Sequence, residues 1–219
     1  VSAQRLSASG APRWSAAGVA ICRAANDQPA PKPVSDGAGG AIIAWSDGRS
    51  GTGDIYAQRI NAAGTPLWST DGVAVCDAQD NQGGVELIAD GSGGAIITWT
   101  DFRTAATSAQ DVYMQRIDAS GGSQWVTNGV AVCTAAGNQT GTPLVSDGSG
   151  GAIIAWTDGR TGGVAGLDIY GQPPTAAGGG GAGGGPGRPP RGGGGRGAAP
   201  PRRGGGGLGG ASPWRARRP

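Results

Sequence analysis

Apolar residues in this chain occur in short, nearly continuous runs and never at helical spacing. The segments 41–47, 95–101 and 152–158 all have the form A-I-I-x-W-x-D. A short apolar run bounded by turn residues predicts a β-strand that is buried on both faces. Because no stretch repeats apolar residues at intervals of three and four, the pattern predicts an all-β chain.

Each of these runs belongs to a unit in which four strands are expected. In the middle unit the expected strands are 85–90, 94–101, 111–118 and 129–133. The sequence D-G-S-G-G between the first two predicts a tight hairpin turn, since glycine adopts positive φ at little cost. It has neither the Lys-Ser/Thr pair of a phosphate-binding loop nor the alternating acids of a calcium loop.

The unit recurs along the chain. Copies begin with Q-R at Gln4, Gln58 and Gln115, and a partial fourth begins at Gln172, with steps of 54, 57 and 57 residues. Four antiparallel strands, buried on both faces and repeated at a constant period, predict blades of a β-propeller. The repeats of a parallel β-helix are much shorter, and an immunoglobulin-like tandem needs units of roughly 100 residues.

The repeated motifs also carry a family resemblance. The form S-D-G-x-G-G-A-I-I-A-W-x-D-x-R, followed by D-I-Y-A-Q-R-I-D-A-x-G-x-x-L-W, resembles repeats of uncharacterised bacterial secreted or surface β-propeller proteins across residues 1–172. The segment Y-A-Q-R-I-N-A-A-G-T-P-L-W is similar to quinoprotein-type blades, and Asp118–Gly121 is similar to the Asp-box hairpin of sialidase-like propellers. The first resemblance implies an extracellular or cell-surface protein. No catalytic residue of a quinoprotein or sialidase is matched.

The phase of the repeat predicts an incomplete ring of about three blades in residues 1–172. Val1 aligns with Ile55, so the chain is expected to begin inside a third strand. Closed propellers have roughly four to eight blades. We therefore expect the chain to be part of a larger protein, with open blade faces through which it can self-associate.

Charge separates a tail, residues 173–219, from the repeats. Residues 1–172 hold all 15 acidic residues and nine of the 17 basic ones, whereas the tail holds eight arginines and no acid. Its Gly/Pro/Arg-rich composition predicts disorder. A reading-frame error or degenerate end is favoured, because Q-P-P-T-A-A-G still follows the repeat. A flexible spacer and a nucleic-acid-binding tract are the alternatives.

Composition restricts the available chemistry. The chain contains no histidine, which excludes serine triads, Cys-His pairs and His-bearing zinc sites within it. We assign no catalytic residue, metal site or cofactor. No run of 18 apolar residues occurs, so no transmembrane span is expected.

An Asp-x-Arg pair follows the second strand of every unit, with a further aspartate before the third strand. We expect a structural ion-pair cluster in which the arginine bridges two carboxylates. The residues are Asp47, Arg49 and Asp54; Asp101, Arg103 and Asp111; and Asp158, Arg160 and Asp168.

The cysteines and tryptophans also recur once per unit. Cys22, Cys76 and Cys133 are expected to be small buried residues, without a disulfide or a zinc ion. The tryptophans are expected in the core between neighbouring blades. They are Trp14, Trp68 and Trp125, and Trp45, Trp99 and Trp156.

The middle unit differs from its neighbours, and there we place the candidate ligand-binding surface. Phe102 replaces the glycine of the other units, and Glu86 lies in the first strand. The favoured function is a non-enzymatic scaffold that binds a protein or glycan. The alternatives are part of a propeller enzyme acting on glycans or alcohols, with its catalytic residues elsewhere, and nucleic-acid binding through the Arg/Gly tail.

Overall fold

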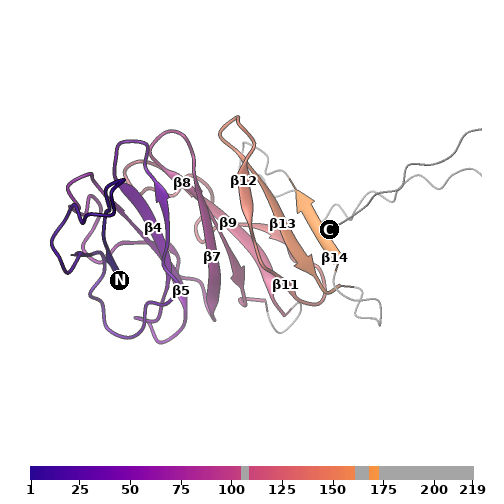
Figure 1. Cartoon of the computed structure of the whole chain (residues 1–219). Helices are drawn as coiled ribbons and strands as arrows, with labels where there is room; N and C mark the ends of the chain where they lie inside the picture. The colour runs from indigo at the N-terminus through magenta and orange to yellow at the C-terminus, as the bar shows by residue number, and fades with distance from the viewer. Residues whose placement is uncertain (105–108, 161–167, 173–219) are drawn as a thin grey trace, which may run out of the picture. The chain divides into compact units, whose positions relative to one another are not determined.

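The computed structural model describes residues 1–104, 109–160 and 168–172, the last range by its backbone only (Figure 1). These residues form strands joined by turns and loops, and they contain no helix. The prediction of an all-β fold is therefore confirmed for the described residues. The tail 173–219, expected to be disordered, lies outside the described residues. So does the segment 105–108, between the second and third strands of the middle unit.

The strands form four antiparallel sheets, numbered in chain order. Sheet 1 consists of β1 (Ser2–Ala3) and β2 (Val19–Ala20). Sheet 2 has the order β3 (Lys32–Ser35), β4 (Ala41–Asp47), β5 (Asp54–Ile60), β6 (Val73–Cys76). Sheet 3 has the order β7 (Gln82–Ala89), β8 (Ala95–Asp101), β9 (Asp111–Ile117), β10 (Val130–Cys133). Sheet 4 contains β11 (Gln139–Thr140), β12 (Leu144–Ser146), β13 (Ala152–Asp158) and β14 (Asp168–Gln172).

The predicted unit of four strands appears directly in sheets 2 and 3. In sheet 4 the first strand is divided, so β11 and β12 pair with the two ends of β13 while β14 pairs with its other edge. Sheet 3 has a register shift between Gly83 and Glu86 at the same place, within a continuous β7. Sheet 1 corresponds to the third and fourth strands of a unit, in agreement with the alignment of Val1 with Ile55.

The D-G-x-G-G segment is a hairpin turn, as predicted. In the turn between β7 and β8, Asp90 Oδ1 accepts hydrogen bonds from the backbone N–H groups of Ser92 and Gly94, at 2.8 and 2.9 Å. Arg116 closes the turn by donating to Asp90 Oδ2 at 2.9 and 3.1 Å. A Cβ at Gly94 would lie 2.1 Å from the carbonyl oxygen of Ile117, so glycine is required there to let two backbones approach.

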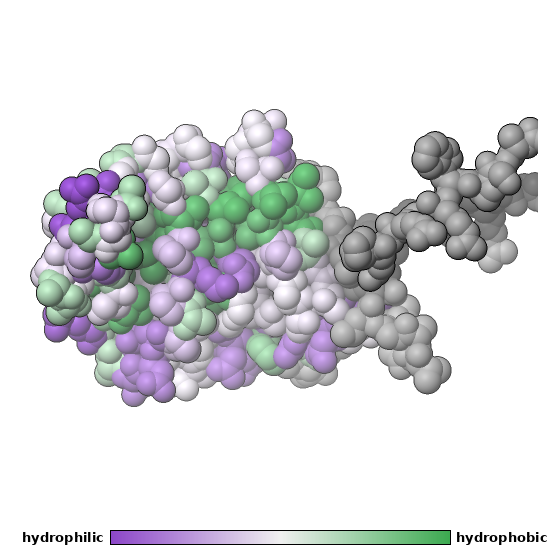
Figure 2. Space-filling view, in the orientation of Figure 1, coloured by the Kyte–Doolittle hydropathy of each residue, from purple (hydrophilic) through white to green (hydrophobic). Residues whose placement is uncertain are grey.

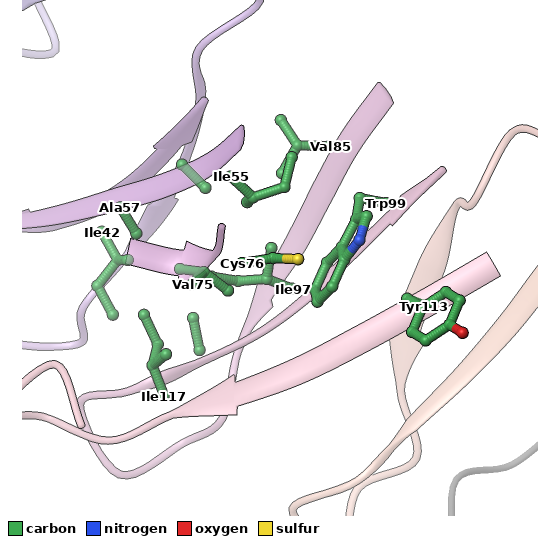
Figure 3. Close-up of a cluster of buried hydrophobic side chains, with 12 residues drawn as sticks. Ile42, Ile55, Ala57, Val75, Cys76, Val85, Ile97, Trp99, Tyr113 and Ile117 are labelled. Carbon is green, nitrogen blue, oxygen red and sulfur yellow. The ribbon is translucent and has the colours of Figure 1, made fainter. Parts of the chain in front are cut away.

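Successive sheets pack face against face. Ile42, Ile55 and Ala57 of sheet 2 contact the face of sheet 3 that carries Ile97 and Trp99 (Figure 3). The opposite face of sheet 3 packs against Ala152, Ile154 and Trp156 of sheet 4. All seven residues of β8 are buried as a result, which confirms that this strand is covered on both faces.

The first strands of the three larger sheets lie beside one another. β7 contacts β3 of sheet 2 and β12 of sheet 4. Figure 2 shows a band of apolar residues on the surface over β7 and β12. The antiparallel sheets agree with the predicted units, and their arrangement as blades of a propeller stays a proposal.

We expect Gly94→Ala to destabilise the chain more than Gly91→Ala. At Gly91 the φ angle is +79° and nothing lies within 4 Å of an added Cβ, so alanine there costs only backbone strain of about 1–2 kcal/mol. At Gly94 an added Cβ collides with backbone, and we expect a loss of about 3 kcal/mol in the free energy of unfolding. Urea denaturation measures both values, and equal losses would contradict the close approach at Gly94.

Candidate functional site

The Asp-x-Arg motif lies where one sheet meets the next. At the junction of sheets 2 and 3, the Asp101 carboxylate is fully buried and Arg103 binds it with two parallel hydrogen bonds, Nε to Oδ1 at 2.9 Å and Nη2 to Oδ2 at 2.6 Å. The indole N–H of Trp99 donates to Asp101 Oδ2 at 2.8 Å. The backbone N–H of Arg103 donates to Oδ1 at 2.9 Å. Both carboxylate oxygens are thus hydrogen-bonded, as a buried charge requires.

The Arg103 guanidinium also joins this carboxylate to the neighbouring sheet. Its Nη2 lies 3.1 Å from the sulfur of Cys76, at the end of β6 in sheet 2, and 2.8 Å from the backbone oxygen of Asn128. Its Cζ lies 4.0 Å from the centre of the Tyr113 ring, a cation–π distance. Four groups from two sheets therefore converge on one arginine.

We call this arrangement the junction cluster, defined as a Trp, an Asp and an Arg of one sheet with a Cys of the preceding sheet. It occurs at all three junctions between the described sheets. The members at the other two junctions are Trp45, Asp47, Arg49 and Cys22, and Trp156, Asp158, Arg160 and Cys133.

The expectation that the arginine bridges two carboxylates was wrong for Arg49 and Arg103. Arg49 directs its fork at both oxygens of Asp47. The second aspartate of that unit, Asp54, instead accepts a hydrogen bond of 2.7 Å from the hydroxyl of Ser50. This bidentate geometry pairs two guanidinium donors with the two oxygens of one carboxylate, and Arg49 Nη2 also donates to the backbone oxygen of Asp71 at 2.7 Å.

In the middle unit Asp111 likewise bonds the Thr104 hydroxyl. In the last unit Asp168 is described by its backbone only.

The cysteines are free; Cys22 and Cys76 are buried, as predicted, whereas Cys133 is half-buried. Each sulfur lies 3.1–3.4 Å from an arginine Nη2 of the next sheet. Burial raises the pKa of the Cys76 thiol to about 11, so the thiol is protonated near neutral pH. This sulfur therefore serves as a neutral, polarisable contact for the guanidinium.

The junction clusters of Asp158 and Asp47 favour the charged form of the carboxylate. Burial of the Asp158 carboxyl raises its pKa, but hydrogen bonds from Arg160 and Trp156 outweigh burial and lower the pKa to about 2. The pKa of Asp47 is likewise lowered, because hydrogen bonds from Arg49 and Trp45 outweigh its burial. A carboxyl held in this way cannot donate a proton near neutral pH, which argues against its use as a general acid.

The tryptophans that lie outside the junction clusters make another contact between sheets. Trp14 Nε1 donates to the backbone oxygen of Ala62 at 3.1 Å, and Trp68 Nε1 donates to that of Ala119 at 3.1 Å. The same two oxygens accept hydrogen bonds of 3.2 Å from Arg5 and Arg59. These tryptophans therefore join neighbouring units, which supports their predicted place between sheets.

A repeated glutamine has a structural role that the sequence interpretation missed. Gln58 is fully buried; its Oε1 accepts hydrogen bonds from the backbone N–H groups of Arg59 and Trp68, and its Nε2 donates to the backbone oxygen of Ser69. Gln115 makes the equivalent three bonds. The repeated Q-R dipeptide was the available signal, because a glutamine retained in every unit indicates an amide with the same hydrogen-bond partners in each, and the exposed Gln4 makes these bonds as well.

Phe102 and Glu86, the two candidate surface residues, are not brought together among the described residues. Glu86 forms an ion pair of 2.7 Å with Lys32 of sheet 2, and both side chains are about two-fifths exposed, at 39% and 43%. Phe102 is half-buried just after β8, where its backbone N–H bonds the backbone oxygen of Asn81 at 3.0 Å. They are therefore two separate features of the middle unit.

Within residues 1–104, 109–160 and 168–172, no group of three or more His, Cys, Asp or Glu side chains is placed to hold a metal ion. The same residues contain no helix with the length and hydropathy needed to cross a membrane. The junction clusters, in contrast, bring together an aspartate, an arginine, a tryptophan and a cysteine at each described junction between sheets.

Removing the buried charge at one junction should be costly. We expect Asp101→Asn to lower the free energy of unfolding by about 3 kcal/mol, because Arg103 loses the carboxylate that neutralises it. The matched control is Glu86→Gln, which breaks an exposed ion pair and should cost at most about 1 kcal/mol. Chemical denaturation measures both, and similar losses would contradict a structural role for the cluster.

Acid should weaken the junction of sheets 3 and 4. The pKa of Asp158 is about 2 in the folded chain, below the value of about 3.9 for an unfolded aspartate. Its stabilisation is therefore complete above about pH 4 and is lost as the pH falls toward 2. We expect the free energy of unfolding to fall less steeply over this range in Asp158→Asn than in the parent chain. Equal slopes in urea titrations at each pH would disprove this assignment.

Comparison with known proteins does not assign the chain to a family. A scan against models of protein families finds no match. A search of curated proteins also finds none. The interpretation of its function therefore depends on the chain's own residues and their geometry.

Proposed function

We propose that residues 1–172 act as a non-enzymatic scaffold of β-propeller type, part of a larger exported bacterial protein, that binds a protein or glycan. The observation that carries this proposal is the recurrence of the junction cluster at every described junction. A catalytic pair is needed once in a molecule, whereas a packing element is needed wherever two sheets meet. Recurrence therefore supports a structural use of these acids and arginines.

The contacts between sheets support the propeller-type arrangement. β7 lies against both β3 and β12, so the first strands of three successive sheets adjoin one another. In a propeller, sheets are placed radially around an axis with one edge strand of each innermost. Adjoining first strands are what such an arrangement requires. The external location rests only on the resemblance of the repeat to secreted and surface proteins.

The middle unit supplies the candidate ligand-binding residue. Phe102 is a half-buried aromatic at a loop, where the neighbouring units have Gly48 and Gly159. An aromatic ring with one accessible side can pack against the apolar face of a sugar or an apolar side chain. Glu86 is the weaker candidate, because its carboxylate already pairs with Lys32.

The alternatives have less support. For the enzyme alternative, the three Asp-x-Arg aspartates are buried and held by hydrogen bonds, so they offer no accessible acid. The nucleic-acid alternative depends on residues 173–219, which lie outside the described residues.

Phe102→Gly tests the proposal, because it restores the residue of the sister units. We expect glycans bound by the parent chain on a printed array to bind the variant at least about tenfold more weakly, equivalent to about 1.4 kcal/mol. Leu67→Ala is the matched control, since Leu67 is also an exposed apolar residue but lies in a loop of sheet 2. Undiminished binding by Phe102→Gly would reject this surface, and release of shortened glycans would favour an enzyme.

A further inference from the structure

Within the part of the chain that the structure describes, one face of sheet 4 carries exposed apolar residues although the equivalent faces of sheets 2 and 3 are buried. Val145 of β12 and Ile153 of β13 are cross-strand partners and are 60% and 49% exposed. The equivalent partners are Ile88 and Ile96 in sheet 3, where Ile96 is 0% exposed. β13 consequently alternates between buried and accessible residues, whereas β8, of nearly the same sequence, is buried throughout.

The chain itself indicates what covers such a face, because the same contact is made twice. In sheet 2 the pair Val34 and Ile42 packs against sheet 3, which brings Ala95, Ile97 and Trp99 from its second strand. In sheet 3 the pair Ile88 and Ile96 packs against sheet 4. The residues brought there from the second strand are Ala152, Ile154 and Trp156. Both partners therefore present the alternating sequence A-x-I-x-W.

The polar part of the contact also recurs. At both of these junctions, a buried Asp-Arg pair of the covering sheet lies against the cysteine that ends the fourth strand of the covered one. In the covering sheet, the second strand and the two residues that follow it together have the sequence A-x-I-x-W-x-D-x-R. This sequence supplies the apolar residues that pack on the covered face and the charged pair at the end of the strand.

We propose that the Val145–Ile153 face of sheet 4 is a docking surface for a further unit of this same repeat, entering with its A-x-I-x-W strand. This inference rests on the proposed propeller-type scaffold and specifies its partner. The face continues the series of junctions already present between sheets 2, 3 and 4. Burial of the exposed Val145 and Ile153 side chains would stabilise the docked state, and a further repeat unit provides an apolar surface to bury them.

The test is a chain in which residues 116–172 are duplicated directly after Gln172, with residues 173–219 retained at the end. Val145→Cys is introduced into the parent and the extended chains, and its reaction with a water-soluble thiol reagent is timed after subtraction of the native cysteines. We expect the reaction to be about tenfold slower or more in the extended chain, because the added unit covers the face. Leu67→Cys, far from this face in the sequence and 48% exposed before substitution, should react equally in both chains.

Ile153→Asp provides the second arm. It should restore fast labelling of Val145→Cys in the extended chain, because a charge on the face opposes docking of an apolar strand. Unchanged labelling on extension would overturn the proposal. So would an added unit that stays unfolded by circular dichroism, since a repeat unit takes its core from the neighbour on which it docks.

A second copy of the chain is the competing occupant. It would slow labelling of the parent at high protein concentration and produce a dimer in sedimentation, and that result would overturn the choice of a further repeat unit. The outcome is independent of the Phe102 binding experiment. Failure to dock with loss of glycan binding in Phe102→Gly would reject this inference alone, whereas docking without any effect of Phe102→Gly would reject the ligand site alone.

Discussion

The buried carboxylate of the junction cluster is the interaction on which contact between successive sheets depends. Arg103 and Trp99 hydrogen-bond both oxygens of the buried Asp101 carboxylate, which offsets the cost of removing this group from water. The arginine in turn lies against Cys76 of the preceding sheet. The hydrogen-bonded pair of one sheet therefore contacts its neighbour, in addition to the apolar packing across the same junction.

Stacking makes the environment of each sheet depend on its neighbours. β4, β8 and β13 have nearly the same sequence, yet only β8 is buried at all seven positions. β8 has a complete sheet on each side, whereas β13 has one on the side of Trp156 and an accessible Ile153 on the other. A repeat unit of this kind is stabilised by what it contacts as much as by its own strands.

Local features of the fold were predictable because their causes lie within a few residues. The strands, the glycine turns and the tryptophan core all follow from short patterns, and the structure has them within a few residues of the expected positions. Partners across a junction were harder to identify. Cys76 and Arg103 are 27 residues apart, and the choice of one carboxylate over two depends on the fork geometry of the guanidinium. The only sequence signal for the hydrogen bonds of Gln58 was the repeated Q-R dipeptide.

The sequence by itself determined the repeat, the four strands of each unit and the turns between them, because apolar periodicity and glycine conformation act locally. It also located the middle unit as the one that departs from its neighbours, through Phe102 and Glu86. Only the tertiary structure decided that Glu86 pairs with Lys32, that each Asp-Arg pair is used between sheets, and that Ile153 is exposed where Ile96 is buried. These outcomes depend on which surface lies opposite a side chain, and a surface formed by distant residues exists only after the sheets have stacked.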